Sequence, residues 1–551
     1  MRRPIPSTRR SLVSLLALIL LIAPGWTNAQ PTFEPAGDWE YLLTAAERSD
    51  FQATTRYDEV FAFVESVATM SANLHRARMG YTLEGREIPL VVAGKDLTSS
   101  SPEAVRSSEK LRVFILANIH AGEVCGKEAM LTLLRHLAAG QYDAWLDDLV
   151  LIVAPIYNAD GNERVQMAHR GVQNGPHAGM GQRENAQGLD LNRDHLKLVS
   201  PEATSLIQTL QAYDPHVLID LHTTNGTKHG FHLTYSPPLH PDTDPEILAL
   251  QTEVLLPNIR ARMAERSWAT YDYGNLLDER WDADGQLIRA AGWYTFDHRA
   301  RFGTNYGGLR NRLTILSEAY AYLPFRERVE VTYDFVVDIL DELQAGRDII
   351  SRVTRAADQR ATAGLDSLTL SARPRLVDPV AEIPMRPVDV RTHPYLHGET
   401  YFERSANDAL ETITVAQAFT AFEASRKQKT PEAYLIPDTL TWVVDRLRTH
   451  GLVLEQMSEP RPVTVSSFMI DATTQAGRLY QGVLTRSASG RWHDSEETVG
   501  PGWIRVPMRQ PLARIAFHLL EPESDDGLVH WALMDNELQE GTRYPILREL
   551  P

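Results

Sequence analysis

Short, nearly continuous apolar runs recur along the first two thirds of the chain. These runs, which are rich in β-branched residues, are Leu111–Ile119, Leu149–Asn158, His216–His222 and Leu313–Tyr322. Such runs are typical of strands that are buried on both faces of a sheet. Between two of them, Ser200–Tyr213 has a helical pattern, with Ser200 as N-cap and Pro201 in the first turn. Strands that alternate with helices predict an α/β fold.

The pattern changes near residue 365, where a proline-rich stretch begins. We expect further helices over Tyr57–Ala72, Lys127–Leu137, Pro241–Met263 and from Arg326 to about Ala361, and a short strand at Glu87–Val92. Beyond the stretch the predicted elements are strands at Val463–Ile470, Gly502–Met508 and Val529–Asp535, and one helix, Asp438–Gly451, capped by Asp438 and ended by Gly451. The prediction is a first domain over residues 30–365 and a β-rich accessory domain over residues 366–551.

Composition agrees with a globular protein of two or three domains. The chain has 551 residues, of which 43% are hydrophobic and 23% charged, and its formal net charge is −17. Nucleic acids and anionic lipids bind basic surfaces. We therefore expect neither as a partner of this acidic chain.

Residues 1–29 have the pattern of a secretory signal peptide. Arginines at positions 2, 3, 9 and 10 precede the apolar run Ser11–Ala23, and Thr27-Asn28-Ala29 offers small residues for cleavage. We expect a periplasmic or secreted protein with no membrane span after signal removal. Arg9-Arg10 leaves the twin-arginine route open. The apolar run is shorter than the ~20 residues that a spanning helix needs, which argues against an uncleaved anchor.

His120 and Glu123 lie where the first apolar run ends and a helical pattern begins. Loops that follow strand ends in α/β folds often carry the chemistry. A catalytic zinc ion takes three protein ligands and keeps one position for water. We predict His120 and Glu123 as two ligands and His222, at the end of another strand, as the third. Asp220 is expected to accept a hydrogen bond, and Cys125, the single cysteine, to pack in the core.

The ordered motifs resemble those of the carboxypeptidase A-like zinc metallopeptidases. They are His120/Glu123, Asn158–Gly161, Gly188–Asp194, Asp220–His222 and Leu313–Glu318, which together cover about residues 110–330. The resemblance implies a mixed, mostly parallel β-sheet flanked by helices, one Zn²⁺ ion, and a peptide or peptide-like substrate with a free carboxylate.

The resemblance also implies individual roles. Asp190 would accept a hydrogen bond from the ring of His120 and fix its tautomer. Asn192 and Arg193 would bind the terminal carboxylate of the substrate. Glu318 would be the general base for the zinc-bound water.

Two roles are less closely defined by the motifs. An arginine should polarise the scissile carbonyl, and Arg170 and Arg183 both lie in the appropriate loop, with Arg170 the better match to the family's arginine cluster. For the mobile tyrosine that covers the substrate, Tyr306 is the first choice and Tyr294 the second. The spacings from Glu123 and from Arg193 to His222 are shorter than in the digestive enzymes, so some loops that shape the cleft must be reduced.

The leading hypothesis is an exported zinc metallocarboxypeptidase that hydrolyses a C-terminal peptide bond. A zinc amidohydrolase of the same fold, acting on cell-wall stem peptides or acyl amino acids, is the first alternative. A non-catalytic peptide-binding module, in which the β-rich tail has the main role, is the second. The side-chain preference and the purpose of the tail stay open.

Overall fold

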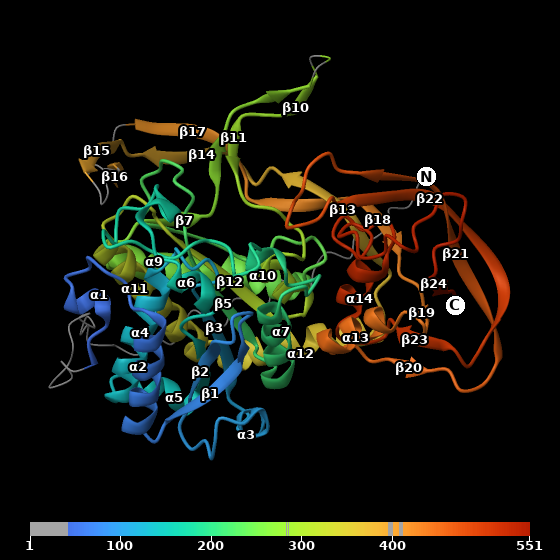
Figure 1. Cartoon of the computed structure of the whole chain (residues 1–551), viewed down its shortest axis with the longest axis horizontal. Helices are drawn as coiled ribbons and strands as arrows, with labels where there is room; N and C mark the ends of the chain where they lie inside the picture. The colour runs from blue at the N-terminus through green and yellow to red at the C-terminus, as the bar shows by residue number, and fades with distance from the viewer. Residues whose placement is uncertain (1–41, 283, 285, 395–399, 407–411) are drawn as a thin grey trace, which may run out of the picture.

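An eight-stranded sheet forms the centre of the first part of the molecule (Figure 1). The computed structural model describes residues 42–282, 284, 286–394, 400–406 and 412–551, so the predicted signal peptide lies outside the described residues. In order across the sheet, the strands are β1 (Leu74–Tyr81), β2 (Glu87–Ala93), β4 (Leu149–Ala154), β3 (Leu111–Ala117), β5 (Val217–Thr223), β12 (Leu313–Ala319), β6 (Leu233–Ser236) and β7 (Thr270–Asp272). Strand β3 runs parallel to β4 and β5, and β5 runs parallel to β12, whereas β2 and β6 join this parallel centre in the opposite direction. The predicted mixed, mostly parallel sheet is confirmed.

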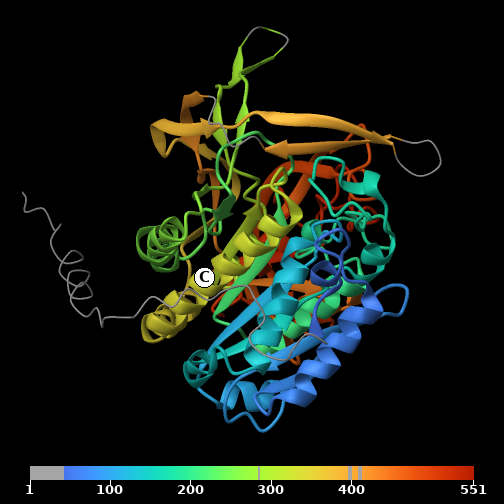
Figure 2. The ribbon, with the colours of Figure 1, turned by 90° about the vertical axis from the view of Figure 1, so that its left-hand side faces the viewer.

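Helices cover both faces of this sheet. One face carries α2 (Tyr57–Met70), α4 (Cys125–Ala138), α9 (Leu256–Glu265) and α11 (Phe325–Ala345). The other carries α7 (Pro201–Tyr213) and α10 (Gly303–Leu309), against which α13 (Thr441–His450) and α14 (Ala513–Leu520) of the C-terminal part pack. Figure 2 looks onto the first layer, where α2, α4 and α11 lie side by side. In β3, Val113 and Ile115 pack into one layer, while Phe114 and Leu116 pack into the other. Burial of both faces explains why the central strands are apolar at nearly every position.

The first part contains further helices. They are α1 (Ala45–Arg48), α3 (Pro102–Ser107), α5 (Asp143–Asp148), α6 (Ala159–Glu163), α8 (Pro245–Leu250), the π-helix η5 (Gln251–Leu255) between α8 and α9, α12 (Arg347–Ala363), and the 3₁₀ turns η3 (Met167–Arg170) and η4 (Leu191–Arg193). The N-cap of α7 is Ser200, as expected, and its hydroxyl accepts a hydrogen bond from the amide of Ala203.

The C-terminal part is rich in β-strands, as predicted. Its six-stranded sheet contains, in order, β20 (Glu455–Gln456), β23 (Trp503–Pro507), β19 (Ala433–Pro437), β24 (Leu547–Glu549), β21 (Arg461–Gln475) and β22 (Arg486–Val499). Two ribbons, β13 (Ser367–Arg375) with β18 (Ala421–Lys429) and β15 (Val388–Pro394) with β16 (Thr400–Ala406), lie outside this sheet. The predicted boundary near residue 365 falls between α12 and β13.

The two parts of the chain share structure on both sides of that boundary. A four-stranded sheet joins β14 (Asp378–Met385) and β17 (Thr412–Phe419) to β11 (Gly292–Tyr294) and β8 (Asn275–Leu277) from the first part. In addition, α13 and α14 belong to the same apolar core as α7 and α10. The C-terminal part is therefore packed into the first part and holds segments of it in place.

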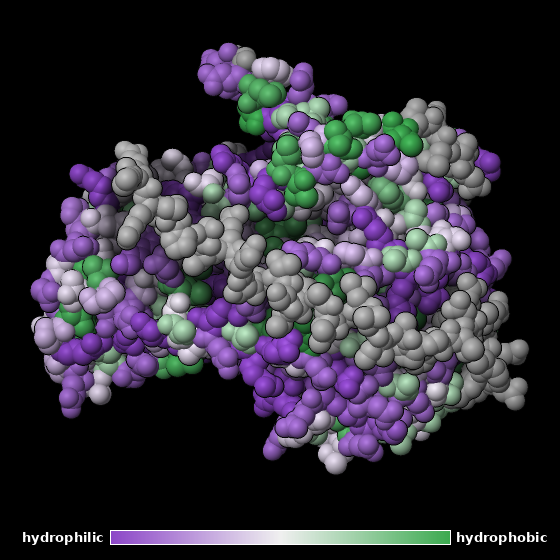
Figure 3. All heavy atoms as spheres, turned by 180° about the vertical axis from the view of Figure 1, so that it is seen from behind, coloured by the Kyte–Doolittle hydropathy of each residue, from purple (hydrophilic) through white to green (hydrophobic). Residues whose placement is uncertain are grey.

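Exposed apolar side chains gather on two neighbouring ribbons. Leu287 and Ile288 lie on the projecting ribbon of β9 (Arg280–Trp281) and β10 (Leu287–Arg289), and Val380, Ile413 and Val415 lie on β14 and β17. Figure 3 shows green, hydrophobic areas along the upper edge of the molecule. Among the described residues, none of the helices has the length and the apolar character that a membrane span needs.

Three sequence expectations about elements are corrected. The stretch from Arg326 to Ala361 is two helices, because α11 ends at Gly346 and α12 begins directly after it. Asp438 does not cap the helix near Gly451, since α13 begins after Leu440, which makes no side-chain cap. Val529–Asp535 forms turns and no strand. The apolar residues of that segment fill the core beside α14, which explains the strand-like pattern.

Candidate active site

Two parallel strands bring the predicted ligands together. His120 follows β3 and His222 is the penultimate residue of β5, so both lie at the carboxyl edge of the sheet. Glu123 lies one turn after His120, in the corner before α4, and its amide donates to the carbonyl of His120 at 2.9 Å. Gly122 in this corner has no room for a side chain, because an added Cβ would lie 2.5 Å from the side chain of Arg170. The corner is thus packed tightly and holds both side chains in place.

The donor atoms of these three side chains converge. His120 Nδ1 lies 3.0 Å from Glu123 Oε1, and His222 Nδ1 lies 3.0 Å from Glu123 Oε2. The two Nδ1 atoms are 3.2 Å apart. All three side chains are almost completely buried. Two imidazoles and a carboxylate at this separation are the donors that zinc takes in catalytic sites.

Carboxylates lie beside the opposite nitrogens of both rings. Asp190 Oδ1 is 3.0 Å from His120 Nε2, and Asp220 Oδ2 is 2.9 Å from His222 Nε2. A proton on each Nε2 leaves both Nδ1 lone pairs directed into the cluster, where a metal ion would use them. Burial opposes ionisation of Asp190, but His120, Arg193 and Arg183 hold the pKa of Asp190 well below its usual range.

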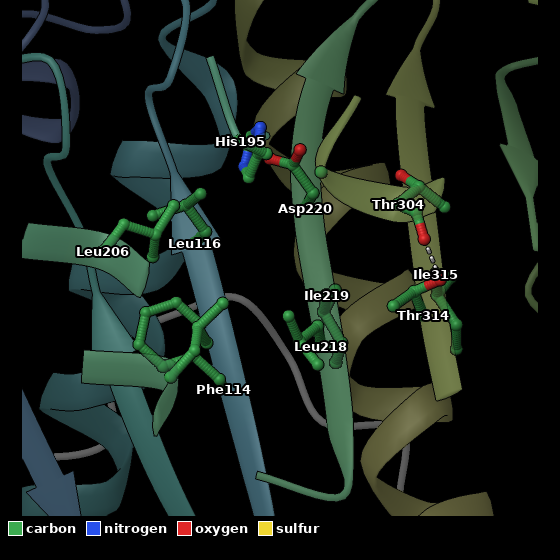
Figure 4. Close-up of a pocket in the computed structure, with 12 residues that line it drawn as sticks. Phe114, Leu116, His195, Leu206, Leu218, Ile219, Asp220, Thr304, Thr314 and Ile315 are labelled. Atoms are coloured by element: carbon green, nitrogen blue, oxygen red, sulfur yellow. Dashed lines mark hydrogen bonds between the residues drawn. The ribbon is translucent and has the colours of Figure 1, made fainter. Parts of the chain in front are cut away.

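Figure 4 shows the surroundings of Asp220 on the second layer of the molecule. Asp220 and His195 face each other at the upper end of β5, and the small cavity below them is lined by apolar residues such as Phe114, Leu116 and Leu218. His195 Nδ1 lies 3.2 Å from the carbonyl of Arg301. Asp220 therefore lies between His195 and His222, on the same face of β5 as His222.

Glu318 lies beside this cluster because of the strand register. It is opposite His222 in the parallel pair of β12 and β5. Its Oε2 is buried and accepts no hydrogen bond from the described residues. Burial raises the pKa of Glu318 to about 8, and the nearby charge of Glu123 adds to this, against the opposing influence of His222. A carboxylate with an unused oxygen is thus held next to the proposed metal position.

The two candidate arginines occupy different places. Arg170 is buried, with its Nη2 2.9 Å from Glu123 Oε1 and 3.3 Å from the carbonyl of Thr223. Arg183 lines the pocket above the cluster. Its Nε and Nη2 donate to Asp190 Oδ2 at 3.0 and 2.8 Å, and its Nη1 lies 3.5 Å from Glu123 Oε1. Only Arg183 of the two is among the residues that line this pocket.

Asn192 and Arg193 also line the pocket, on the 3₁₀ turn η4. Asn192 Oδ1 accepts from the amide of Gly303 at 2.9 Å, which ties η4 to the start of α10. The Arg193 guanidinium lies over the ring of Phe302, 3.9 Å from its centroid, and its Nη1 donates to the carbonyl of Asn192 at 2.7 Å. The planar group is therefore held in one orientation at the pocket wall.

Two residues of the C-terminal part reach this turn, and no motif in the sequence indicates them. Arg193 Nε donates to the hydroxyl of Tyr480 at 3.1 Å, and the amide of Asp190 donates to the side-chain oxygen of Gln481 at 2.8 Å. Both belong to the loop between β21 and β22, which is distant from the motifs along the chain. This contact gives the accessory part a direct connection to the site.

Neither predicted covering tyrosine lies at the site. Tyr306 is completely buried, and its hydroxyl lies 2.8 Å from His450 Nδ1. Tyr294 stacks on Phe419, in the four-stranded sheet. The tyrosine that lines the pocket is Tyr273. Burial raises the pKa of Tyr273, as does the nearby charge of Glu318.

The pocket over the cluster has a cavity volume of about 110 Å³. Its remaining walls include Asn225, Phe296 and Phe302. Cys125 lies beneath it, fully buried, with its sulfur 3.2 Å from the hydroxyl of Thr223. His229 packs on Tyr320, so it is part of the aromatic core and not of the cluster.

Comparisons with known proteins agree with this arrangement. Residues 60–229 match the family model of the zinc carboxypeptidases. The chain is similar to carboxypeptidase 2 of Trichophyton rubrum, with 24% identity over 90% of this chain and 86% of the relative. It is also similar to carboxypeptidase 2 of Trichophyton equinum, with 26% identity and the same coverage of both chains.

Similarity to solved structures is weaker. A putative carboxypeptidase A from Shewanella denitrificans aligns over 53% of this chain and 69% of its own length, at 18% identity and a TM-score of 0.39. The family match and the donor set agree with one catalytic zinc ion as the cofactor. Residues 60–229 are therefore similar to the zinc carboxypeptidases, and the resemblance predicted from the ordered motifs is confirmed.

Proposed function

We propose that this protein is an exported metallocarboxypeptidase that removes the C-terminal residue of peptides. One observation carries the proposal: the unused carboxylate oxygen of Glu318 lies in the same pocket as the three-donor cluster and Arg193. A base, a metal position and a cation for a carboxylate are the parts that this reaction needs. A module that only binds peptides has no need of a buried, unpaired carboxylate, which costs stability.

Glu318 is the proposed general base. When bound by His120, Glu123 and His222, a zinc ion supplies Lewis acidity, which polarises a carbonyl and brings the pKa of water to about 7. Glu318 takes the proton of the attacking water and then donates it to the leaving amine. The positive charge of the ion favours the ionised form of the carboxylate, so its pKa falls when the metal binds.

Arg183 is the proposed partner of the scissile carbonyl. It lines the pocket, and Asp190 and Glu123 fix the direction of its guanidinium. A preorganised cation of this kind stabilises the negative charge that develops on the carbonyl oxygen. Arg170 is proposed instead to position Glu123, because it contacts that carboxylate from outside the pocket.

Asn192 and Arg193 are proposed to hold the terminal carboxylate of the substrate. A planar guanidinium fork suits a carboxylate, and Phe302 and Tyr480 keep this fork in place. We propose that Tyr273 covers the bound substrate in place of Tyr306. The β21–β22 loop then contributes to substrate binding by supporting Arg193.

Export is proposed from residues 1–29, whose basic start, apolar run and small-residue end are those of a signal peptide. Amino-terminal sequencing of the mature protein should find a start at or near residue 30. A mature chain that begins at Met1 would contradict export through this segment.

The test of the proposed function is the dependence of hydrolysis on Arg193. Arg193→Ala should raise KM for a peptide with a free C-terminus by about 10- to 100-fold, as expected for a lost charge-assisted pair. The conservative variant Arg193→Lys should recover part of the loss. An equal KM for wild type and Arg193→Ala would contradict the proposed carboxylate site. Peptides with D-residues, as in cell-wall stems, serve as the second substrate set, and faster cleavage of these would favour the amidohydrolase function.

A further inference from the structure

A second group of metal-ligating side chains lies outside the active site. His240, Asp242 and His518 offer donor atoms that all lie within 4.8 Å of one another. The exposed fractions of the three residues are 3%, 8% and 2%. None of them lines the pocket over His120 and Glu123.

The three residues come from different parts of the chain. His240 and Asp242 lie in the loop between β6 and α8, and His518 lies on α14 of the C-terminal part. A third segment holds the carboxylate in place, because the hydroxyl and the amide of Thr369, on β13, donate to Asp242 Oδ1 and Oδ2 at 2.7 and 2.8 Å. The cluster is thus built at the junction of the two parts of the molecule.

One ring nitrogen of this cluster has no hydrogen bond. His518 Nε2 is buried and forms no hydrogen bond with the described residues, although Asp242 Oδ2 is only 3.3 Å away. His240 Nδ1 accepts from the amide of Asp242 at 3.1 Å, so a metal ion at this nitrogen would take the place of that amide. The two rings are close, with centroids 4.4 Å apart at an angle of 73°. An unpartnered imidazole nitrogen this deeply buried calls for an explanation.

We propose that His240, Asp242 and His518 bind a second divalent metal ion, zinc, that fastens α14 to the loop after β6. Two nitrogens and one oxygen are a donor set that zinc accepts, at bond lengths of about 2.0–2.2 Å. A tetrahedral ion needs a fourth donor, and the adjacent pair of His298 and Asp525, whose Nε2 and Oδ2 atoms are 3.2 Å apart, offers one. The ion has a structural role because the cluster is closed on all sides by protein.

The site is coupled to the wall of the active-site pocket. Asn305 Oδ1 accepts from the amide of Leu239, next to His240, and its Nδ2 donates to the carbonyls of Asp297 and Arg299 at 2.8 and 3.0 Å. These two residues belong to the loop that carries Phe296. A metal ion at the second cluster therefore stabilises this pocket wall from behind.

Metal content per chain tests the proposal directly. The full-length mature protein, equilibrated with buffered zinc and then freed of loose metal, should contain two equivalents. His518→Asn and His222→Ala should each reduce this to one, and only His518→Asn should keep measurable hydrolysis. His493→Asn, which removes an exposed histidine of β22, is the matched control and should keep both equivalents.

If His518→Asn does not fold, the His222→Ala protein decides the matter alone, since its single remaining equivalent must lie outside the active site. One equivalent in wild type together with none in His222→Ala would overturn the proposal. Cobalt in place of zinc gives a second readout: its absorption spectrum should show two ions in wild type and lose one component in His518→Asn.

Discussion

The clusters His120–Glu123–His222 and His240–Asp242–His518 offer the same kinds of donor, two imidazoles and a carboxylate, and the first lines the pocket that also contains Glu318 and Arg193. Around the first cluster, Arg183, Arg193 and Glu318 line the pocket in which a substrate would bind. Around the second, Thr369 already occupies both carboxylate oxygens. The residues around a cluster, more than its ligand atoms, therefore distinguish a catalytic metal site from a structural one.

The largest effect should come from brief chelation. An ion in the open cluster exchanges with solvent more readily than one in the closed cluster, so a short treatment should remove one equivalent and reduce hydrolysis to background. Activity should return with added zinc, while circular dichroism stays unchanged throughout. Loss of both equivalents at the same rate would remove the proposed distinction.

Substitution of Glu318 should have the next largest effect. Glu318→Gln keeps the size of the side chain but removes the base, so kcat should fall by about 10³-fold, or roughly 4 kcal/mol. Zinc content serves as the control and should not change. A variant that retains full kcat would exclude Glu318 as the base.

Glu318 should also govern the pH dependence of stability in the metal-free protein. Its pKa, raised to about 8 by burial, lies above the value in the unfolded chain, so the native state binds more protons between pH 5 and 8. The free energy of unfolding should therefore fall as pH rises, by roughly 3 kcal/mol over two pH units. Denaturant titrations of the chelated protein measure this slope. Glu318→Gln should lack it, and an identical slope in both proteins would contradict the assignment.

Substitution of Asp190 tests how much its contacts with His120 and Arg183 contribute to metal binding at the first cluster. Asp190→Asn weakens the contacts to His120 and Arg183, so metal affinity or activity should fall by about 10- to 100-fold. Competition with a fluorescent zinc chelator measures the affinity. Asp242→Asn is the matched change in the other cluster, and it should weaken only the second equivalent.

The smallest effect concerns the link between the C-terminal part and the pocket. Tyr480→Phe removes the hydroxyl that accepts from Arg193, at a cost of about 1 kcal/mol, which raises KM about fivefold and leaves kcat unchanged. Steady-state kinetics on a peptide with a free C-terminus separate the two constants. A change in kcat alone would contradict a role in substrate binding.

Short-range patterns account for what could be predicted from the sequence. The central strands are continuous apolar runs because both faces are covered, and polar residues at their ends identify the edge where His120, His222 and Glu318 meet. Asp190 and Arg193 were proposed from a single motif. For each of these residues, its place in the sequence after a strand or in a turn indicates where it lies in the fold.

Residues that depend on packing between distant segments could not be predicted in this way. Tyr306 is the first choice from the sequence and Tyr273 has no motif that identifies it, but the side of α10 that carries Tyr306 turns into the core against His450. Tyr480 reaches Arg193 only because the six-stranded sheet places its loop there. His518 meets Asp242 through the packing of α14, which the sequence pattern did not even identify as a helix.

The most direct test is the hydrolysis of two peptides that differ only at the C-terminus, one free and one amidated, followed by mass spectrometry. The proposed function predicts loss of single C-terminal residues from the free peptide and little or no change in the amidated one. Equal cleavage of both peptides, or cleavage in their interior, would show that the pocket does not select a terminal carboxylate and would contradict the account.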